Sequence, residues 1–325
     1  MQDLLKNERF NAAYERLAAV SLNPRRHTAK DARAHSEAVA TMAIRLGAAN
    51  SCTATQLELL ENLGRAHDIG KITGTARPER SLEVLAACQI SHPTLLALVK
   101  WHDTSLPWYH AAQRGQAPSD KAWRRLQREV DLRLLCMFMV ADRVDAPGGW
   151  RRNAPTTWFI SEVQSRGLVA EIELDVDGHP SEVCAGAALV TGAGGLARVL
   201  VTRTRANGFE LPKGGIEWDE LPAEAAIREL QEESGIDGEF EAGNAIGQLD
   251  YLVDHGRGRH LKRVHYYRVY CAGKPTFAPL PRRTHERMWL GQEEARRIPL
   301  VNEGLREMLR SALSSPLESN FVSNR

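Results

Sequence analysis

The stretch 214–236, which reads GGIEWDELPAEAAIRELQEESGI, decides the fold of the second half of this chain. Pro222 suits the first turn of a helix, because the N–H that proline lacks would be unpaired there. Strong helix formers follow over 223–233. Gly235 stands where a helix can end in a left-handed cap. The stretch therefore predicts a loop, a helix and a second loop.

Three acidic residues of the predicted helix share one face. Glu229, Glu232 and Glu233 stand at positions i, i+3 and i+4, so their carboxylates lie close together. Such a run of like charges is most often a solvated surface. The alternative is that it supplies the hard oxygen ligands that Mg²⁺ or Mn²⁺ prefer. Arg228, four residues from both Glu224 and Glu232, can orient a carboxylate by paired hydrogen bonds.

The spacing of the whole stretch distinguishes these alternatives. Gly214 is followed after five residues by Glu220, and seven further residues lead to R-E-L-Q-E-E-S-G-I. This is the complete pattern of the Nudix box, so this half of the chain resembles the Nudix hydrolases. The resemblance implies an α/β/α sandwich, a divalent metal on the three glutamates and hydrolysis of a pyrophosphate. It also implies catalytic roles for Arg228, Glu229, Glu232 and Glu233, with Glu232 or Glu233 as the expected proton acceptor.

The residues before the box predict how a substrate is held. F-E-L-P-K-G-G (209–215) resembles the Nudix branch that acts on dinucleoside polyphosphates and diphosphoinositol polyphosphates, with Phe209 in place of the usual Trp. The resemblance implies that a polyphosphate is bound by Arg203, Arg205, Lys213 and Gly214.

Residues 263–270 alternate like a strand and contain the pair Tyr266-Tyr267. This resembles the strand that places a base-stacking Tyr in bacterial diadenosine tetraphosphate hydrolases. An ordinary strand Tyr packed in a core explains the pair equally well. Glu286 stands where many Nudix enzymes carry a further acidic residue near the metal.

The first half of the chain holds a second set of metal-binding residue types. They lie in segments with helical apolar spacing: His35, His67, Asp68, His102, Asp103 and Asp142. Groups so far apart in sequence converge only inside a helical bundle, with side chains that project inward from facing helices. A lone His is more often a hydrogen-bonded surface or core residue, so the combination carries the interpretation.

The order H…HD…H…D, with H-D-I-G-K over 67–71, resembles the HD-domain metal-dependent phosphohydrolases. The resemblance implies four metal ligands: His35, His67, Asp68 and Asp142. Two imidazoles with two carboxylates suit Mn²⁺, Fe²⁺, Co²⁺ or Ni²⁺ as well as Zn²⁺. Phosphate contacts are expected from Lys71, His102 and Arg143, although some members use the later His for a second metal. No G-Y-P triplet follows, which argues against the cyclic-di-GMP phosphodiesterase branch.

Composition bounds the remaining classes. A chain of 325 residues is long enough for two domains with separate cores. The net charge of +1 gives no global attraction to nucleic acid, although R-G-R-H-L-K-R (257–263) is a candidate for phosphate contacts. Five scattered cysteines, never in C-x-x-C spacing, argue against a disulfide framework or a cysteine zinc site. With no signal peptide and no long apolar run, we expect a cytoplasmic protein without a membrane partner.

Apolar spacing predicts a helical region followed by an α/β region. Helices are expected over 10–21, 32–47, 55–67, 81–88, 94–101, 122–142 and 156–166. Alternation predicts strands over 168–176, 183–190 and 197–202, and a last helix is expected over 301–313. The expected domains are an HD-like bundle over 1–168, a linker or first strand over 169–180, a Nudix domain over 181–313 and a flexible tail over 314–325.

Both resemblances imply hydrolysis of phosphate bonds on a small-molecule nucleotide. The leading hypothesis is a bifunctional enzyme, with diadenosine tetraphosphate as the favoured Nudix substrate and an HD phosphohydrolase acting on a related nucleotide. The first alternative is RNA end processing, because W-H-D-T-S-L-P (101–107) is similar to HD modules fused to polynucleotide kinases. The HD half would then remove 2′,3′ phosphates and the Nudix half a 5′ pyrophosphate or cap. The second alternative is a nucleotide-sensing domain that regulates the other; the oligomeric state is left open.

Overall fold

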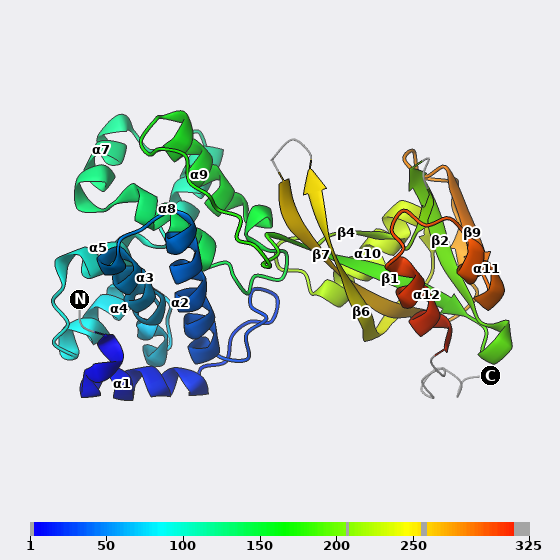
Figure 1. The fold of residues 1–325 in the computed structure, drawn as a ribbon, viewed down its shortest axis with the longest axis horizontal. Helices are drawn as coiled ribbons and strands as arrows, with labels where there is room; N and C mark the ends of the chain where they lie inside the picture. The colour runs from blue at the N-terminus through cyan, green and yellow to red at the C-terminus, as the bar shows by residue number, and fades with distance from the viewer. Residues whose placement is uncertain (1–2, 206–207, 255–258, 315–325) are drawn as a thin grey trace. The chain divides into compact units, whose positions relative to one another are not determined.

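The chain divides into two compact units, Met1–Ser181 and Glu182–Arg325. The computed structural model describes residues 3–205, 208–254 and 259–314. The first unit is helical and the second is built around a sheet (Figure 1). This confirms the predicted fold class, a helical bundle followed by an α/β domain. The predicted tail beyond residue 314 and positions 257 and 258 of the basic stretch 257–263 lie outside the described residues.

The first unit is a bundle of short helices: α1 (Glu8–Glu15), α2 (Ala32–Ala49), α3 (Ala54–Ala66), α4 (Pro78–Ala87), α5 (Pro93–Trp101), α6 (Ser105–Gln113), α7 (Asp120–Glu129), α8 (Leu132–Ala141) and α9 (Ala154–Ser165). Their starts follow from local sequence. Asp31 caps α2 by accepting from the N–H of Ala34, and Thr53 forms a capping box with Gln56 at the start of α3. None of the helices in the described ranges is both long and apolar enough to cross a membrane.

The segment predicted as one helix over 122–142 is two helices, α7 and α8, so that prediction is wrong. Val130 between them is extended, with φ −140° and ψ 151°. The Asp131 side chain accepts hydrogen bonds from the N–H groups of Arg133 and Leu134. An aspartate in this position caps the start of α8, and this local structure competes with continuation of α7 through the same residues.

α3 packs closely against α2 where Gly64 faces the α2 backbone. A Cβ atom on Gly64 would lie 2.4 Å from Cα of Ala40. Only glycine allows the two backbones to come this close. His35 stands on α2 and His67 directly follows α3, so this contact brings two predicted metal ligands together.

Residues 168–176 form no strand, so the strand prediction there is wrong. The segment packs on the helical core through Ile172 and Leu174, which are both buried. The side chain of Asn50 donates to the carbonyl of Glu173 and accepts from its N–H. The alternating pattern therefore reflects burial of one side of the segment. The backbone of Glu173 bonds to the side chain of Asn50, where a strand would bond to a neighbouring strand.

The second unit is built on a mixed sheet with the strand order β3-β2-β1-β7-β6, in which β4 also pairs with β1 and β9 with β2. The strands are β1 (Glu182–Thr191), β2 (Arg198–Arg205), β3 (Gly208–Glu210), β4 (Lys213–Gly215), β6 (Phe240–Asp254), β7 (Arg259–Cys271) and β9 (Glu286–Leu290). β1 runs parallel to β7, whereas β6 and β7 form a long antiparallel pair. β5 (Ile236–Asp237) and β8 (Thr276–Phe277) form a separate small sheet.

Helices cover both faces of the main sheet (Figure 1). α10 (Pro222–Ser234) buries Ala225, Ala226 and Leu230 against one face. α11 (Gln292–Arg297) and α12 (Leu305–Ser314) pack against the other face. This is the predicted α/β/α sandwich. As expected, α10 begins at Pro222 and ends at Gly235, which adopts a left-handed φ of 64°.

Substitution of Gly64 by Ala should destabilise the first unit. The added Cβ meets the α2 backbone, which cannot move aside as a side chain can, and overpacking of this kind costs roughly 1–3 kcal/mol. Gly47→Ala is the matched control, because its Cβ would meet only the flexible ends of Leu57 and Leu60 at close range. Thermal unfolding followed by circular dichroism compares the two. Equal unfolding temperatures for both variants would contradict the role given to Gly64.

Candidate metal centres

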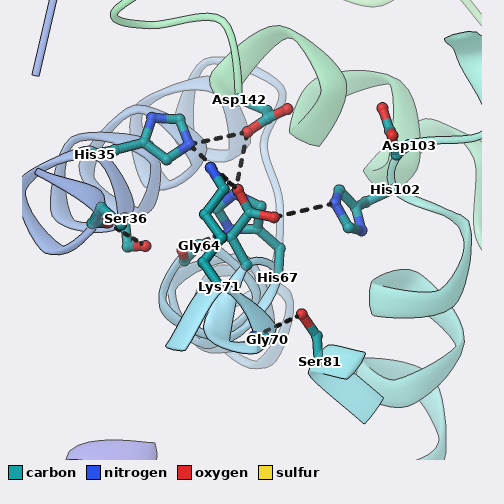
Figure 2. Close-up of polar contacts among 12 residues, drawn as sticks. His35, Ser36, Gly64, His67, Gly70, Lys71, Ser81, His102, Asp103 and Asp142 are labelled. Atoms are coloured by element: carbon teal, nitrogen blue, oxygen red, sulfur yellow. Dashed lines mark hydrogen bonds and ion pairs between the residues drawn. The ribbon is translucent and has the colours of Figure 1, made fainter. Parts of the chain in front are cut away.

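Three helices of the first unit end at one place, and each has a predicted site residue at its C-terminal cap. His67 caps α3, His102 caps α5 and Asp142 caps α8. The C-terminal end of a helix carries a partial negative charge, which favours a cation nearby. His35 reaches the same place from within α2. Figure 2 shows these three imidazole rings gathered around the same space beside Asp142.

The polar atoms of this centre lie close together. Nε2 of His67 is 3.1 Å from Oδ1 of Asp142 and 3.3 Å from Oδ2 of Asp68. Nε2 of His35 is 3.3 Å from Oδ1 of Asp142 and 3.9 Å from Oδ2 of Asp68. Nε2 of His102 lies 3.9 Å from the other oxygen of Asp68. The four predicted ligands therefore meet, with His102 at the edge of the group.

The second ring nitrogen of each histidine is tied to an acceptor. Nδ1 of His67 donates to the carbonyl of Gly64 at 2.9 Å. Nδ1 of His102 donates to the carbonyl of Val99 at 2.7 Å. Because a carbonyl only accepts, these two rings carry a hydrogen on Nδ1. A neutral ring of this kind presents its lone pair on Nε2, which is the form that binds a metal.

The ring of His35 is arranged in the same way, but its Nδ1 lies 3.1 Å from a carboxylate oxygen of Asp145. Nε2 of His35 and Nε2 of His67 are buried, and within the described part of the chain neither is aligned for a hydrogen bond. Buried polar atoms rarely lack a partner. Two such nitrogens facing two carboxylates form a donor set for a transition metal. These residues therefore fit the predicted cation.

The electrostatics of this centre favour a positive charge. Burial lowers the pKa of His67, but the negative charges of Asp68 and Asp142 outweigh burial and raise the pKa to about 10. Burial raises the pKa of Asp68, but the charges of His67 and Lys71 hold it well below its usual value. The pKa of Asp142 is likewise lowered against burial, chiefly by Arg143. Both carboxylates therefore stay ionised although they are withdrawn from water.

Two further cations flank the same carboxylates. Nζ of Lys71 lies 2.6 Å from Oδ2 of Asp68, and Nη2 of Arg143 lies 3.1 Å from Oδ2 of Asp142. Nη2 of Arg143 also lies 3.9 Å from Oδ1 of Asp103, the acidic residue that follows His102. Lys71 and Arg143, two of the three residues predicted to contact phosphate, are thus placed beside the centre, where a charged group can also orient a carboxylate.

The second unit holds its own acidic group where α10 packs against β4. β4 pairs with β1 so that Gly214 lies opposite Ala185. A Cβ on Gly214 would lie 2.2 Å from the carboxylate of Glu229. The N–H of Lys213 donates to Glu233 at 2.8 Å. The missing side chain at position 214 makes room for one carboxylate, and the adjacent amide holds a second.

The third glutamate of the predicted face, Glu232, is more exposed. Its side chain is 59% exposed, against 12% for Glu229. Within the described residues, the clusters of His, Cys, Asp and Glu tight enough to surround an ion lie in the first unit. The wider spacing on α10 suits Mg²⁺, which keeps several waters and takes few protein ligands.

Arg228 ties these acidic residues to the loop before the helix. Its guanidinium donates to both carboxylate oxygens of Glu220, at 2.8 and 2.9 Å, and to Glu229 at 2.7 Å. It also donates to Glu232 at 3.2 Å and to the carbonyl of Gly215 at 2.7 Å. Paired hydrogen bonds of this kind fix a carboxylate in one orientation.

Sequence reasoning missed Glu220 as the main partner of Arg228. Glu224, expected to be one, instead accepts from the N–H of Leu221 at 3.0 Å, at the start of α10. Helical spacing could not point to Glu220, because it precedes the helix. The sequence marked Glu220 only by its fixed position in the Nudix box, with five residues between it and Gly214.

The pKa of Glu233 is raised by its surroundings. Burial raises its pKa to about 7, and the charges of Glu210 and Glu229 act in the same direction. Lys213 opposes this shift. A carboxyl in these surroundings gains from a cation, as expected of a metal ligand.

The predicted phosphate-binding residues of the second unit are paired with acids. Lys213 contacts Glu210, and its side chain is 15% exposed. Arg203 contacts Glu286 at 2.8 Å and is 39% exposed, so it is the more accessible of the two. The side chain of Arg205 lies outside the described part of the structure.

Tyr266 and Tyr267 face opposite sides of the sheet, as successive residues of a strand do. Tyr266 is completely buried, and a Cβ on Gly186 would lie 2.5 Å from its ring. The prediction of Tyr266 as a base-stacking residue is therefore wrong, since a base cannot reach it. Tyr267 is partly exposed on the α10 side and stays a candidate.

Comparison with protein families identifies two domains. The family model of the HD domain matches residues 33–146, and that of the NUDIX domain matches residues 180–312. The first range contains the four predicted ligands of the helical centre, and the second contains the whole box around α10.

Individual relatives match only parts of the chain. MutT4 from Mycobacterium tuberculosis is 46% identical over 66 residues, which cover 20% of this chain and 25% of the relative. Nudix hydrolase 4 from Arabidopsis thaliana is 32% identical over 117 residues, which cover 36% of this chain and 53% of the relative. The chain thus spans about a quarter and about half of these relatives. A structure of a C. elegans Ap4A hydrolase is 20% identical, with a TM-score of 0.33, and covers 40% of this chain and 93% of that chain.

Metal binding at the helical centre should release protons. With a pKa of about 10, the metal-free ring of His67 holds a second proton near neutral pH, on Nε2 as well as on Nδ1, and a cation can bind Nε2 only after that second proton leaves. The affinity for Co²⁺ should therefore rise as pH is raised toward about 10 and fall as pH is lowered. Isothermal titration calorimetry in buffers of different ionisation enthalpy measures the protons released. A Co²⁺ affinity that does not change with pH would contradict the protonated state of His67.

Substitution of Gly214 by Ala should weaken metal binding on α10 without unfolding the second unit. The new Cβ displaces the Glu229 carboxylate, the flexible end of a side chain. We expect a loss of about 10–100-fold in Mn²⁺ affinity, typical of a disturbed ligand environment. Mn²⁺ titration followed by electron paramagnetic resonance, in an Asp68→Asn background that removes the helical site, measures this. Gly195→Ala is the control, because its Cβ would meet nothing within 4 Å; equal affinities in both variants would contradict the prediction.

Proposed function

Since this chain is a fusion of an HD domain with a Nudix domain, two hydrolase families, we propose that it is a bifunctional metal-dependent hydrolase of nucleotide phosphate bonds. The Nudix half cleaves a pyrophosphate bond in a (di)nucleoside polyphosphate such as diadenosine tetraphosphate. The HD half hydrolyses a phosphate ester of a nucleotide or a similar molecule. The observation that carries this proposal is the pair of buried Nε2 atoms, on His35 and His67, that face two ionised carboxylates.

In the HD half, the metal ligands are His35, His67, Asp68 and Asp142. The donor set suits Mn²⁺, Fe²⁺, Co²⁺ or Ni²⁺. Lys71, Arg143 and His102 surround these ligands and contact the substrate phosphate. Lys71 and Arg143 already lie against the two carboxylates, so a phosphate beside the centre meets positive charge on two sides.

In the Nudix half, Glu229, Glu232 and Glu233 bind Mg²⁺ or Mn²⁺. Arg228 keeps Glu229 and Glu232 in place, and Glu232 or Glu233 accepts the proton of the attacking water. At either site, a divalent cation supplies positive charge beside the phosphate oxygens and lowers the pKa of water. Arg203, Arg205, Lys213 and the backbone at Gly214 bind the polyphosphate chain.

The substrate class rests on the residues before the box and on β7. F-E-L-P-K-G-G (209–215) supports a dinucleoside polyphosphate, and Tyr267 is the aromatic residue of the predicted pair that a base can reach. RNA end processing has less support. The basic stretch 257–263 could contact RNA phosphates, but Lys262 pairs with Glu182 at 3.2 Å and Arg263 with Asp250 at 2.7 Å.

Incubation with diadenosine tetraphosphate and Mg²⁺ or Mn²⁺ tests the proposal. We expect AMP and ATP, and a decrease of at least about 100-fold in their formation when Glu232 or Glu233 is replaced by Gln, because proton transfer of this kind contributes about 10²–10⁴-fold. Asp68→Asn should leave these products unchanged and abolish phosphatase activity toward nucleotide monophosphates. Ion-exchange chromatography of the products separates the two activities.

Glu293→Gln is the control for the Nudix half, since this exposed glutamate lies on α11. If the products are two molecules of ADP, and only Asp68→Asn abolishes their formation, the HD half and not the Nudix half cleaves diadenosine tetraphosphate. No cleavage under any metal would overturn the choice of substrate and leave RNA ends as the next candidates. Binding of the nucleotide that persists without cleavage by the wild-type chain would favour a sensing role.

A further inference from the structure

Asp145, which follows the C-terminal cap of α8, joins two histidines. Its Oδ1 lies 3.1 Å from Nδ1 of His35 and 3.2 Å from Nδ1 of His27. Its Oδ2 lies 3.3 Å from the same nitrogen of His27. Asp145 is buried, with 8% of its surface exposed, so its charge depends on these two partners.

His35 is held differently from the other two histidines of the centre. Backbone carbonyls fix the rings of His67 and His102, and a carbonyl in a helix cannot move independently. The ring of His35 instead depends on a side chain, whose position must itself be maintained. A carboxylate that accepts from a metal-binding histidine fixes the ring and increases its basicity.

His27, in the loop before α2, holds the Asp145 side chain in position. The next residue, Thr28, donates from its N–H to the carbonyl of Asp145 at 2.8 Å, and its hydroxyl donates to the same carbonyl at 3.2 Å. The rings of His27 and His35 contact each other edge to face, with centroids 4.7 Å apart. His27 lies outside the range that the HD family model matches, which begins at residue 33.

We propose that His27 is a positioning residue for the HD metal: by holding Asp145, it fixes the ring of His35 with Nε2 directed at the metal. The inference rests on the proposed metal centre of the HD half. His27 does not touch the metal. Its effect reaches the centre through the sequence of contacts from His27 to Asp145 and from Asp145 to His35.

The test is a Co²⁺ titration of the metal-free full chain, followed by visible absorption, with excess Mg²⁺ present to occupy the Nudix site. His27→Phe keeps a ring but removes the donor, and should weaken Co²⁺ binding about 10–100-fold with unchanged stoichiometry. His27→Asn keeps an N–H donor near the place of Nδ1 and should retain nearly the wild-type affinity. His110→Phe, at an exposed position of α6, is the matched control. If His27→Phe does not fold, His27→Ala makes the same comparison, because the His27 side chain is already 15% exposed.

A second comparison separates positioning from a general structural effect. In an Asp145→Ala background, His27→Phe should cause little further loss of Co²⁺ affinity, because the residue that links it to the centre is gone. Additive losses would overturn the inference, as would an unchanged affinity of His27→Phe. Loss of one Co²⁺ equivalent would also overturn it, since His27 would then be a ligand. If the wild-type chain binds no Co²⁺, or binds it independently of Asp68, the proposed metal centre itself fails, which is a distinct result.

Discussion

Carboxylates withdrawn from water need positive charge close by, and both units of this chain are organised around that requirement. In the helical unit, Asp68 and Asp142 are buried next to two imidazoles, one lysine and one arginine. In the α/β unit, Glu229 and Glu233 are drawn against β4 beside Arg228 and Lys213. Removal of the positive groups would leave uncompensated buried charge, which is among the most destabilising changes a protein can undergo.

The two units meet this requirement with different kinds of structure. In the helical unit, the C-terminal ends of α3, α5 and α8 lie near the carboxylates. Their partial negative charges make the electrostatic potential at this centre more negative. It therefore favours a compact cation with nitrogen ligands. The α/β unit uses one guanidinium to hold Glu220, Glu229 and Glu232. That arrangement leaves Glu232 largely exposed, which suits an ion that keeps part of its water.

Residues whose spacing is set by one helix or one short motif could be predicted from sequence. The acidic face of α10, its start at Pro222 and its end at Gly235 all follow from local rules, and the H…HD…H…D order predicted residues that the bundle does bring together. Features that depend on contacts between segments far apart in the sequence could not be predicted in this way. Alternation over 168–176 cannot distinguish a strand from a segment clamped by Asn50. The buried state of Tyr266 depends on which face of β7 packs on the core, and a one-residue shift in register would reverse it. The contact between His27 and Asp145 was not predicted, because both residues lie in loops, where no periodic pattern indicates which residues meet.

Two glycines show why the ligands of each unit can come as close as they do. At Gly64 the absence of a side chain lets α3 lie against α2, and the carbonyl of the same residue fixes the ring of His67. At Gly214 the absence of a side chain leaves the space that the Glu229 carboxylate occupies. In a helix or a strand, glycine costs roughly 0.5–1 kcal/mol relative to alanine. At both positions that local cost is set against close contacts that a larger residue would prevent, between α2 and α3 in one unit and between α10 and β4 in the other.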